Sequence, residues 1–71
     1  MNKLIGQNLR FLRKKRGYTL GNLASFLGVS QQQISKYEKG INKISAEDIY
    51  KLSNFLMVDI NYFFVKPKNR P

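Results

Sequence analysis

The amino-acid sequence predicts an all-α domain built from five helices. Three observations favour this fold: helix-start signals recur along the chain, glycines follow three of the predicted helices, and apolar residues recur at helical rather than strand spacing. Seventy-one residues allow one compact domain, since a chain this short buries only about 60% of its unfolded surface. Apolar residues make up 42% of the chain, which is enough for a modest core without disulfides, and there is no cysteine.

The first helix is expected over residues 3–16. Ile5, Leu9 and Leu12 recur at helical intervals, and Gly17 follows as the left-handed residue that closes a last turn. The second and third predicted helices end in the same way, at Gly28 and Gly40.

Each later helix begins with an N-cap Ser, Thr or Asp, whose side-chain oxygen accepts a hydrogen bond from an otherwise unpaired backbone N–H. An apolar residue precedes the cap and another follows it four positions on. The four matches are Tyr18-Thr19-Leu23, Val29-Ser30-Ile34, Ile44-Ser45-Ile49 and Val58-Asp59-Phe63, with candidate capping boxes at Ser30–Gln33 and Ser45–Asp48. These signals predict helices over residues 19–27, 30–39, 45–56 and 59–64.

The apolar positions of these helices share one inward face each, and we interpret them as core rather than as ligand contacts. They are Ile5, Leu9, Leu12, Leu20, Leu23, Ala24, Leu27, Ile34, Tyr37, Ile49, Leu52 and Leu56. The helices define one domain over residues 1–65. Residues 66–71 form a basic, proline-broken tail, which we expect to be disordered or to be the start of a linker.

The location follows from what the sequence lacks. No apolar run approaches the roughly 20 residues that span a bilayer, and the first residues turn polar too soon for a signal peptide. The absence of cysteine fits a reducing compartment. We therefore expect a cytoplasmic protein with no membrane partner.

The charge is strongly basic and localised. Thirteen Lys and Arg against four acids give +9, which favours a polyanionic partner, nucleic acid before an anionic membrane. A solubility role would scatter the charge, whereas residues 17–35 carry none. The basic residues gather on either side of that segment, at Arg10, Arg13, Lys14, Lys15 and Arg16 and at Lys36, Lys39 and Lys43.

The segment from Thr19 to Gly40 has the pattern of a helix-turn-helix. A helix of about eight residues, a glycine turn and a second capped helix allow one helix to brace another across DNA. Ala24 is small where the two helices must approach closely, and Gly28 makes the turn.

The second helix of this motif presents one outward face, formed by Gln31, Gln32, Ser35 and Lys36. A solvated helix usually carries acids in its first turn, but this one carries glutamines, so phosphate would meet no repulsion. Gln can pair with adenine N6 and N7, and Lys can reach guanine O6 and N7. The sequence therefore predicts that the helix over residues 30–39 reads base edges in the major groove.

These residues carry a family resemblance over residues 3 to 64. The matching features are Ile5-Gly6, Leu9-x-x-Leu12-Arg13, Arg16-Gly17-x-Thr19, Leu23-Ala24, Leu27-Gly28-Val29-Ser30, Ile34-Ser35-x-Tyr37-Glu38-x-Gly40 and Leu56-x-Val58-x-Ile60. The chain resembles the lambda-repressor/Cro-like (Xre-type) helix-turn-helix family. The resemblance implies a compact five-helix domain, a homodimer on a palindromic double-stranded operator, and control of transcription, as a repressor, without catalysis or cofactor.

The resemblance also implies roles for single residues. Gln31, Gln32, Ser35 and Lys36 match the base-reading positions. Thr19, Lys39, Asn42 and Lys43 match positions that touch phosphate. Arg13 and Glu38 match a pair that joins the first and third helices, which makes physical sense because Glu38 is the only acid in the first 46 residues and would otherwise repel DNA.

Three positions depart from the family pattern. Leu20 stands where the family often has a phosphate-clamping Gln, Phe11 replaces a commonly polar residue and is expected to be exposed, and Met57 replaces a frequent Gly or Asn. A left-handed backbone at Met57 would be costly. Aromatic side chains exceed the needs of one small core and favour a dimer seam at the fourth and fifth helices; they are Phe11, Tyr50, Phe55, Tyr62 and Phe64.

The sequence leaves three other classes of function to compare. A basic amphipathic peptide acting on membranes fits the charge run but not the repeated caps and glycine stops. An antitoxin or protein-interaction module, in which DNA binding is secondary to neutralising a protein partner, would use the same domain. An enzyme or metal site is disfavoured, since there is no His or Cys, and Glu47 and Asp48 sit at a helix N-terminus, where they serve the dipole. No small-molecule substrate is expected.

Overall fold

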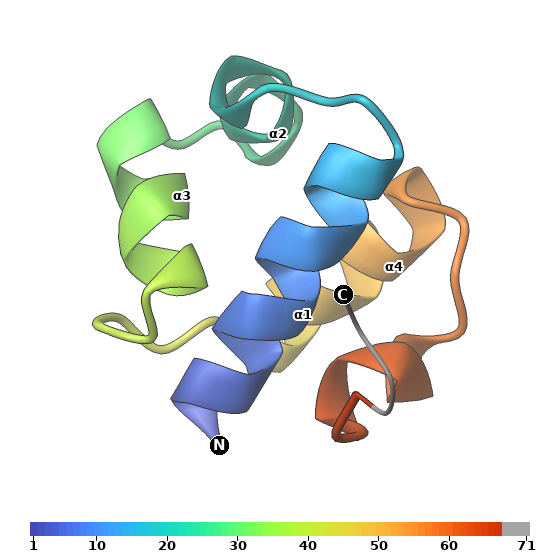
Figure 1. The fold of residues 1–71 in the computed structure, drawn as a ribbon. Coiled ribbons are helices and arrows are strands. Elements are labelled where there is room, and N and C mark those ends of the chain that lie inside the picture. Colours follow the sequence, from blue (N-terminus) through green and yellow to red (C-terminus); the bar gives the residue numbers. More distant parts are fainter. Residues whose placement is uncertain (68–71) are drawn as a thin grey trace.

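The computed structural model describes residues 1–67. Within that range the chain folds into four α-helices and one short 3-10 helix, with no strand. They are α1 (Asn2–Lys15), α2 (Leu20–Leu27), α3 (Gln31–Glu38), α4 (Ala46–Phe55) and η1 (Ile60–Phe64), arranged as Figure 1 shows. The all-α prediction is confirmed, and each α-helix lies within a residue or two of its predicted range.

The expected fifth α-helix is instead the 3-10 helix η1. Asp59 accepts from the backbone N–H of Asn61 at 2.8 Å, and the Tyr62 N–H donates to the Asp59 carbonyl at 2.9 Å, which is 3-10 spacing. The element spans only five residues. The predicted N-cap at Asp59 is correct, but the prediction of a fifth α-helix is wrong. The last carbonyls of this segment accept hydrogen bonds from a side chain of another helix.

The side chain of Asn8 on α1 donates the hydrogen bonds that these carbonyls accept. Its side chain is fully buried, and its amide Nδ2 lies 3.2, 2.9 and 3.1 Å from the carbonyl oxygens of Tyr62, Phe63 and Val65. The two N–H groups of the Asn8 amide are shared among these three carbonyls, so α1 supplies donors that a following helical turn would otherwise provide. One polar side chain thus fixes η1 against the first helix.

All four predicted N-caps are formed, although the capping boxes differ from those expected. Ser30 accepts from the Gln33 N–H and Ser45 from the Asp48 N–H, both at 3.1 Å. The complete reciprocal box lies at Thr19, where the Asn22 side chain accepts from the Thr19 N–H at 2.8 Å. The Gln33 amide oxygen instead accepts from Asn42 at 3.2 Å.

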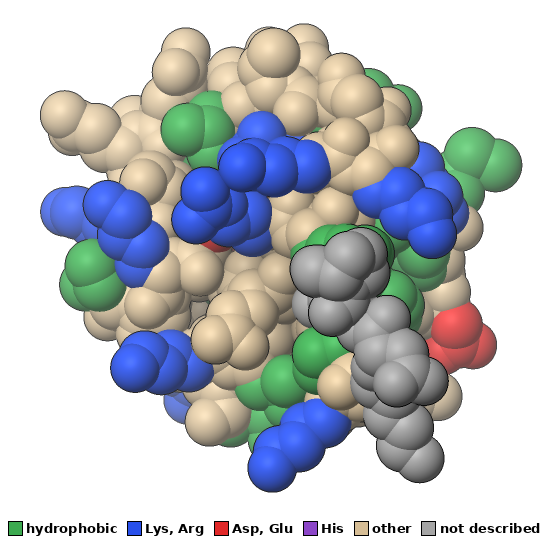
Figure 2. Space-filling view, in the orientation of Figure 1, with side chains coloured by type: hydrophobic (Ala, Val, Ile, Leu, Met, Phe, Trp, Pro, Cys, Tyr) green, Lys and Arg blue, Asp and Glu red, His purple; other side chains and the backbone are tan. Residues whose placement is uncertain are grey.

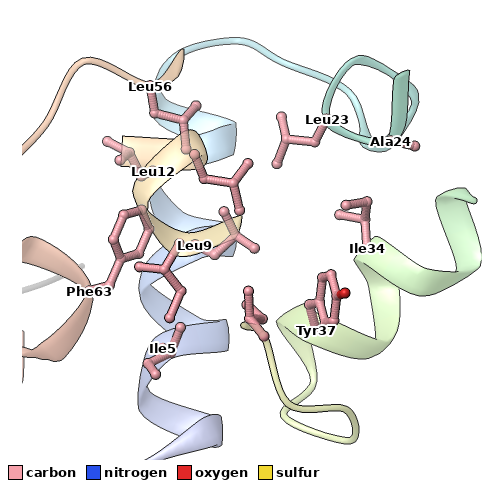
Figure 3. Packing of buried hydrophobic residues seen from close by; sticks show 12 residues of the cluster. Ile5, Leu9, Leu12, Leu23, Ala24, Ile34, Tyr37, Leu56 and Phe63 are labelled. Atoms are coloured by element: carbon pink, nitrogen blue, oxygen red, sulfur yellow. The ribbon is translucent and has the colours of Figure 1, made fainter. Parts of the chain in front are cut away.

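All five elements contribute side chains to the core (Figure 3), in which α1 packs against α3 and η1, while α4 packs against η1 and α2; α1 runs through the centre of the fold (Figure 1). Ten of the twelve predicted core residues are buried, while Leu20 and Leu27 are only half-buried. Ile44 and Phe63 join the core although no helical spacing singled them out as inward. The buried hydrophobic residues are Ile5, Leu9, Leu12, Leu23, Ala24, Ile34, Tyr37, Ile44, Ile49, Leu52, Leu56 and Phe63.

Gly6 sets the distance between α1 and α3. A Cβ on this residue would overlap the Tyr37 carbonyl oxygen and lie 2.7 Å from that of Glu38. Backbone atoms cannot swing aside as a flexible side chain can, so only glycine allows the two helices to come this close. The Ile5-Gly6 pair of the sequence therefore has a packing reason.

Backbone conformation matches two further expectations. Gly17, Gly28 and Gly40 all have φ between 73° and 78°, the left-handed region. Met57 has φ 60°, so the costly conformation expected there is present. Residues 66 and 67 have no helix or strand, and the rest of the predicted tail, residues 68–71, lies outside the described residues. Within residues 1–67, no helix is both long enough and apolar enough to cross a bilayer.

Candidate nucleic-acid interface

The helix-turn-helix is formed by α2 and α3. Gly28 closes α2 in the left-handed conformation, and the Val29 N–H donates to the Ala24 carbonyl at 3.0 Å. Ala24 is 5% exposed and Leu23 and Ile34 are fully buried, so small and apolar residues hold the two helices together. The outer face of α3 is thereby held on a rigid support.

Three of the four candidate base-reading residues gather in one shallow hollow. Gln32, Ser35 and Lys36 line it together with Lys39 and Ile41, and its volume is about 410 Å³. Gln32 and Lys36 are exposed, and Ser35 is half-buried. This is the arrangement that a helix face needs to present amide, hydroxyl and ammonium groups to one ligand.

Gln31 lies apart from that hollow, against α2. A Cβ on Gly21 would lie 3.1 Å from the Gln31 amide nitrogen, so the side chain rests over a glycine of the neighbouring helix. Gln31 is nevertheless exposed at the first position of α3. The glycine gives this side chain the room to lie flat.

The candidate phosphate contacts flank the motif. Thr19 caps α2, and its hydroxyl already accepts from the Asn22 N–H at 3.1 Å. Lys39 caps the end of α3 and is exposed. Asn42 is half-buried and its amide donates to Gln33, whereas Lys43 is exposed in the loop beyond it.

Arg13 and Glu38 meet as a two-pronged ion pair between α1 and α3. Arg13 Nε and Nη2 lie 2.7 and 3.1 Å from the two carboxylate oxygens, and Nη1 donates to the Tyr18 carbonyl at 3.1 Å. Both residues are 8% exposed. The pair neutralises the single acid of the motif and ties α3 to α1.

The charge distribution leaves this side of the molecule basic. Figure 2 shows Lys and Arg side chains across the face that α1 and α3 form, and acidic side chains cover little of it. Within residues 1–67 the remaining ion pair, Lys51–Glu47 at 3.8 Å, is on α4. Arg16 is exposed and forms a hydrogen bond within the fold, from its Nε to the Leu56 carbonyl at the end of α4, at 3.0 Å.

Sequence reasoning missed two residues at this surface. Ile41 is 65% exposed and lines the hollow of Gln32, Ser35 and Lys36, yet nothing in its local pattern distinguishes it from a core residue. Arg10 belongs to the basic cluster that the sequence did reveal, but its proximity to α2 and α3 depends on how α1 packs.

Family comparison agrees with this geometry. The helix-turn-helix family model matches residues 9–63, which contain α2, α3 and most of the domain. The chain belongs to the Xre-type helix-turn-helix family. Curated relatives that match this chain are named as transcriptional regulators. A transcriptional regulator from the ATPase CF(0) region of Rhodospirillum rubrum is 45% identical over 60 residues, covering 84% of this chain and 56% of that protein.

Solved structures of helix-turn-helix regulators have the same fold. The restriction-modification controller protein C.AhdI of Aeromonas hydrophila is 28% identical with a TM-score of 0.80, covering 89% of this chain and 96% of that one. The clp gene regulator ClgR of C. glutamicum is 27% identical with a TM-score of 0.81, covering 89% and 82%. The chain spans about half the length of the curated relatives it matches.

Proposed function

We propose that this Xre-type domain binds double-stranded DNA sequence-specifically, with α3 in the major groove, and represses transcription. The observation that carries the proposal is the outer face of α3, where Gln32, Ser35 and Lys36 share one exposed hollow and no acid lies in the first turn. A helix of eight residues supported along its inner side fits the width of the groove.

Reading and anchoring fall to different side chains. Gln31, Gln32, Ser35 and Lys36 face the bases, since amide and ammonium groups match the edges of adenine and guanine. Thr19, Lys39, Asn42 and Lys43 hold the phosphates on either side. Neutralisation of Glu38 by Arg13 removes the repulsion that an unpaired acid would exert on the DNA backbone.

The operator is proposed to be palindromic and the protein a homodimer. One domain of this size covers too little DNA to specify a long site, and two-fold related copies place their α3 helices about one helical turn apart, roughly 10 base pairs. The proposed partner is double-stranded DNA in the cytoplasm, and the proposed function needs no cofactor.

The test compares a reader with an anchor. Gln32→Ala is expected to cost about 1–3 kcal/mol on the preferred operator and to relax discrimination at one base pair. Lys43→Ala is expected to weaken specific and random DNA alike and to shallow the salt slope by about one unit. Both side chains are exposed, so stability should hardly change. The measurement is a titration against the operator, its single-base variants and random DNA at two salt concentrations.

The operator is first selected from random DNA, which also reveals half-site spacing and symmetry. If Gln32→Ala lowers all affinities together, as Lys43→Ala should, α3 does not read bases and the proposed function fails at its central step.

A further inference from the structure

A cleft of about 150 Å³ opens between α1, the start of α2 and the second half of α3. It is lined by Arg10, Arg13, Leu20, Ser35, Glu38 and Lys39. None of the roles described above uses Arg10. The cleft shares Ser35 and Lys39 with the hollow on the outer face of α3, so the two depressions adjoin on the same side of the molecule.

The charges around the cleft do not cancel. Arg13 and Glu38 are buried and neutralise each other through their two-pronged contact. Arg10 and Lys39 are exposed, and neither forms an ion pair within the part of the chain that the structure describes. Two positive charges therefore remain at a polar cleft, and an anion there would interact with both.

The first turn of α2 adds no hydrogen-bond donor from its leading side chain, because Leu20 is apolar and half-buried in the wall of the cleft. The charged side chains that can hold an anion in this cleft are therefore the guanidinium of Arg10 on α1 and the ammonium of Lys39 on α3, which lie near the first backbone N–H groups of α2. A guanidinium suits this role, since its fork of N–H groups matches two phosphate oxygens.

We propose that Arg10 and Lys39 grip one backbone phosphate of DNA across this cleft, beside the bases that α3 contacts. The proposal rests on the proposed function and adds to it a contact from α1. It assigns to Arg10 a phosphate-binding role while Arg13, one turn later in the same helix, serves the fold.

The experiment compares Arg10→Gln with Lys51→Gln, which removes the same charge from an exposed position on α4. Affinity for the preferred operator and for random DNA is measured over a series of salt concentrations, with a thermal melt for each variant. Arg10→Gln is expected to lower both affinities by a similar factor, about tenfold, and to shallow the salt slope by about one unit for each subunit bound. Lys51→Gln should keep the slope of the original chain, and both variants should melt near its temperature.

A scan with operators carrying one uncharged methylphosphonate linkage locates the phosphate. At one linkage in each half-site, the uncharged substitution should lower the affinity of the unsubstituted protein. At that same linkage it should not lower the affinity of Arg10→Gln any further. The grip is disproved if no such linkage exists, or if Arg10→Gln has the same salt slope as Lys51→Gln. If the original chain binds its operator no better than random DNA, the proposed function itself fails; if it discriminates normally and Arg10→Gln does too with an unchanged slope, only the grip is wrong.

Discussion

Arg13 and Glu38 join α1 to α3 through a nearly buried ion pair. Their side chains are 10% and 5% exposed, so removing one leaves the other charge buried without its partner. Glu38→Ala is therefore expected to lower the free energy of unfolding by about 3–5 kcal/mol. The double variant with Arg13→Ala should lose less than the sum of the two single losses, as measured by urea denaturation. Additive losses would show that the contact contributes no coupling energy.

Met57 has a left-handed backbone conformation, which is strained for any residue that carries a Cβ. Its φ of 60° crowds the Cβ, while its side chain is 82% exposed and buries little. Met57→Gly is expected to raise the free energy of unfolding by about 1 kcal/mol, because glycine adopts this conformation without strain. Met57→Ala keeps the Cβ and should give no such gain. Equal stabilities of the Gly and Ala variants in denaturant melts would mean that the position is not strained.

Packing between whole elements depends on the contact of Gly6 with α3. Gly6→Ala should cost about 3 kcal/mol, the upper end of what overpacking costs, because the Cβ meets backbone carbonyls that cannot move alone. Gly21→Ala is the matched control, because its Cβ would come close only to the flexible end of Gln31, at 3.1 Å, and would make an ordinary contact with the Thr19 hydroxyl at 3.6 Å. Helix propensity should make that variant neutral or up to about 1 kcal/mol more stable. Chemical denaturation of both variants checks the prediction, and a Gly6→Ala protein as stable as Gly21→Ala would contradict it.

The aromatic side chains divide differently from what the sequence suggested. Phe55 is half-buried and packs against two other rings of the same chain, stacking on the exposed Phe26 with ring centroids 4.4 Å apart and lying tilted against Tyr18 with centroids 4.9 Å apart. Phe11 and Tyr62 are half-buried, so the expected exposure of Phe11 is wrong. Of the five aromatics considered surplus to the core, only Tyr50 and Phe64 are exposed, at 59% and 41%. The candidate seam is therefore reduced to the outer side of α4 and the end of η1.

At the scale of the whole molecule we expect a homodimer through that seam. Tyr50→Ala should weaken the dimer measured by sedimentation, because an exposed tyrosine anchors interfaces well. Phe26→Ala, on α2, should leave association unchanged. A dimer that neutralises roughly eight phosphates should show log K falling with log salt at a slope near −7. A strictly monomeric protein at every concentration, bound to a single asymmetric half-site, would overturn the dimer.

The sequence by itself determined the positions of the α-helices, the turn between α2 and α3 and the exposed face of α3. Caps, glycine stops and helical spacing act over four residues or fewer, so the local sequence contains all the information they need. The joining of Arg13 to Glu38 needed the family resemblance, because the residues are far apart in the chain. The structure shows the contact that the resemblance implied.

Only the tertiary structure decided the rest. Asn8 makes its shortest bond to the carbonyl of Phe63, 55 residues away, and this contact holds η1 against α1, with the Phe63 side chain in the core. The clearance at Gly6 and the cleft of Arg10 likewise exist only once α1 lies against α3. No pattern of residue types encodes such contacts, because they depend on the distance between atoms that the chain brings together only when every helix is packed.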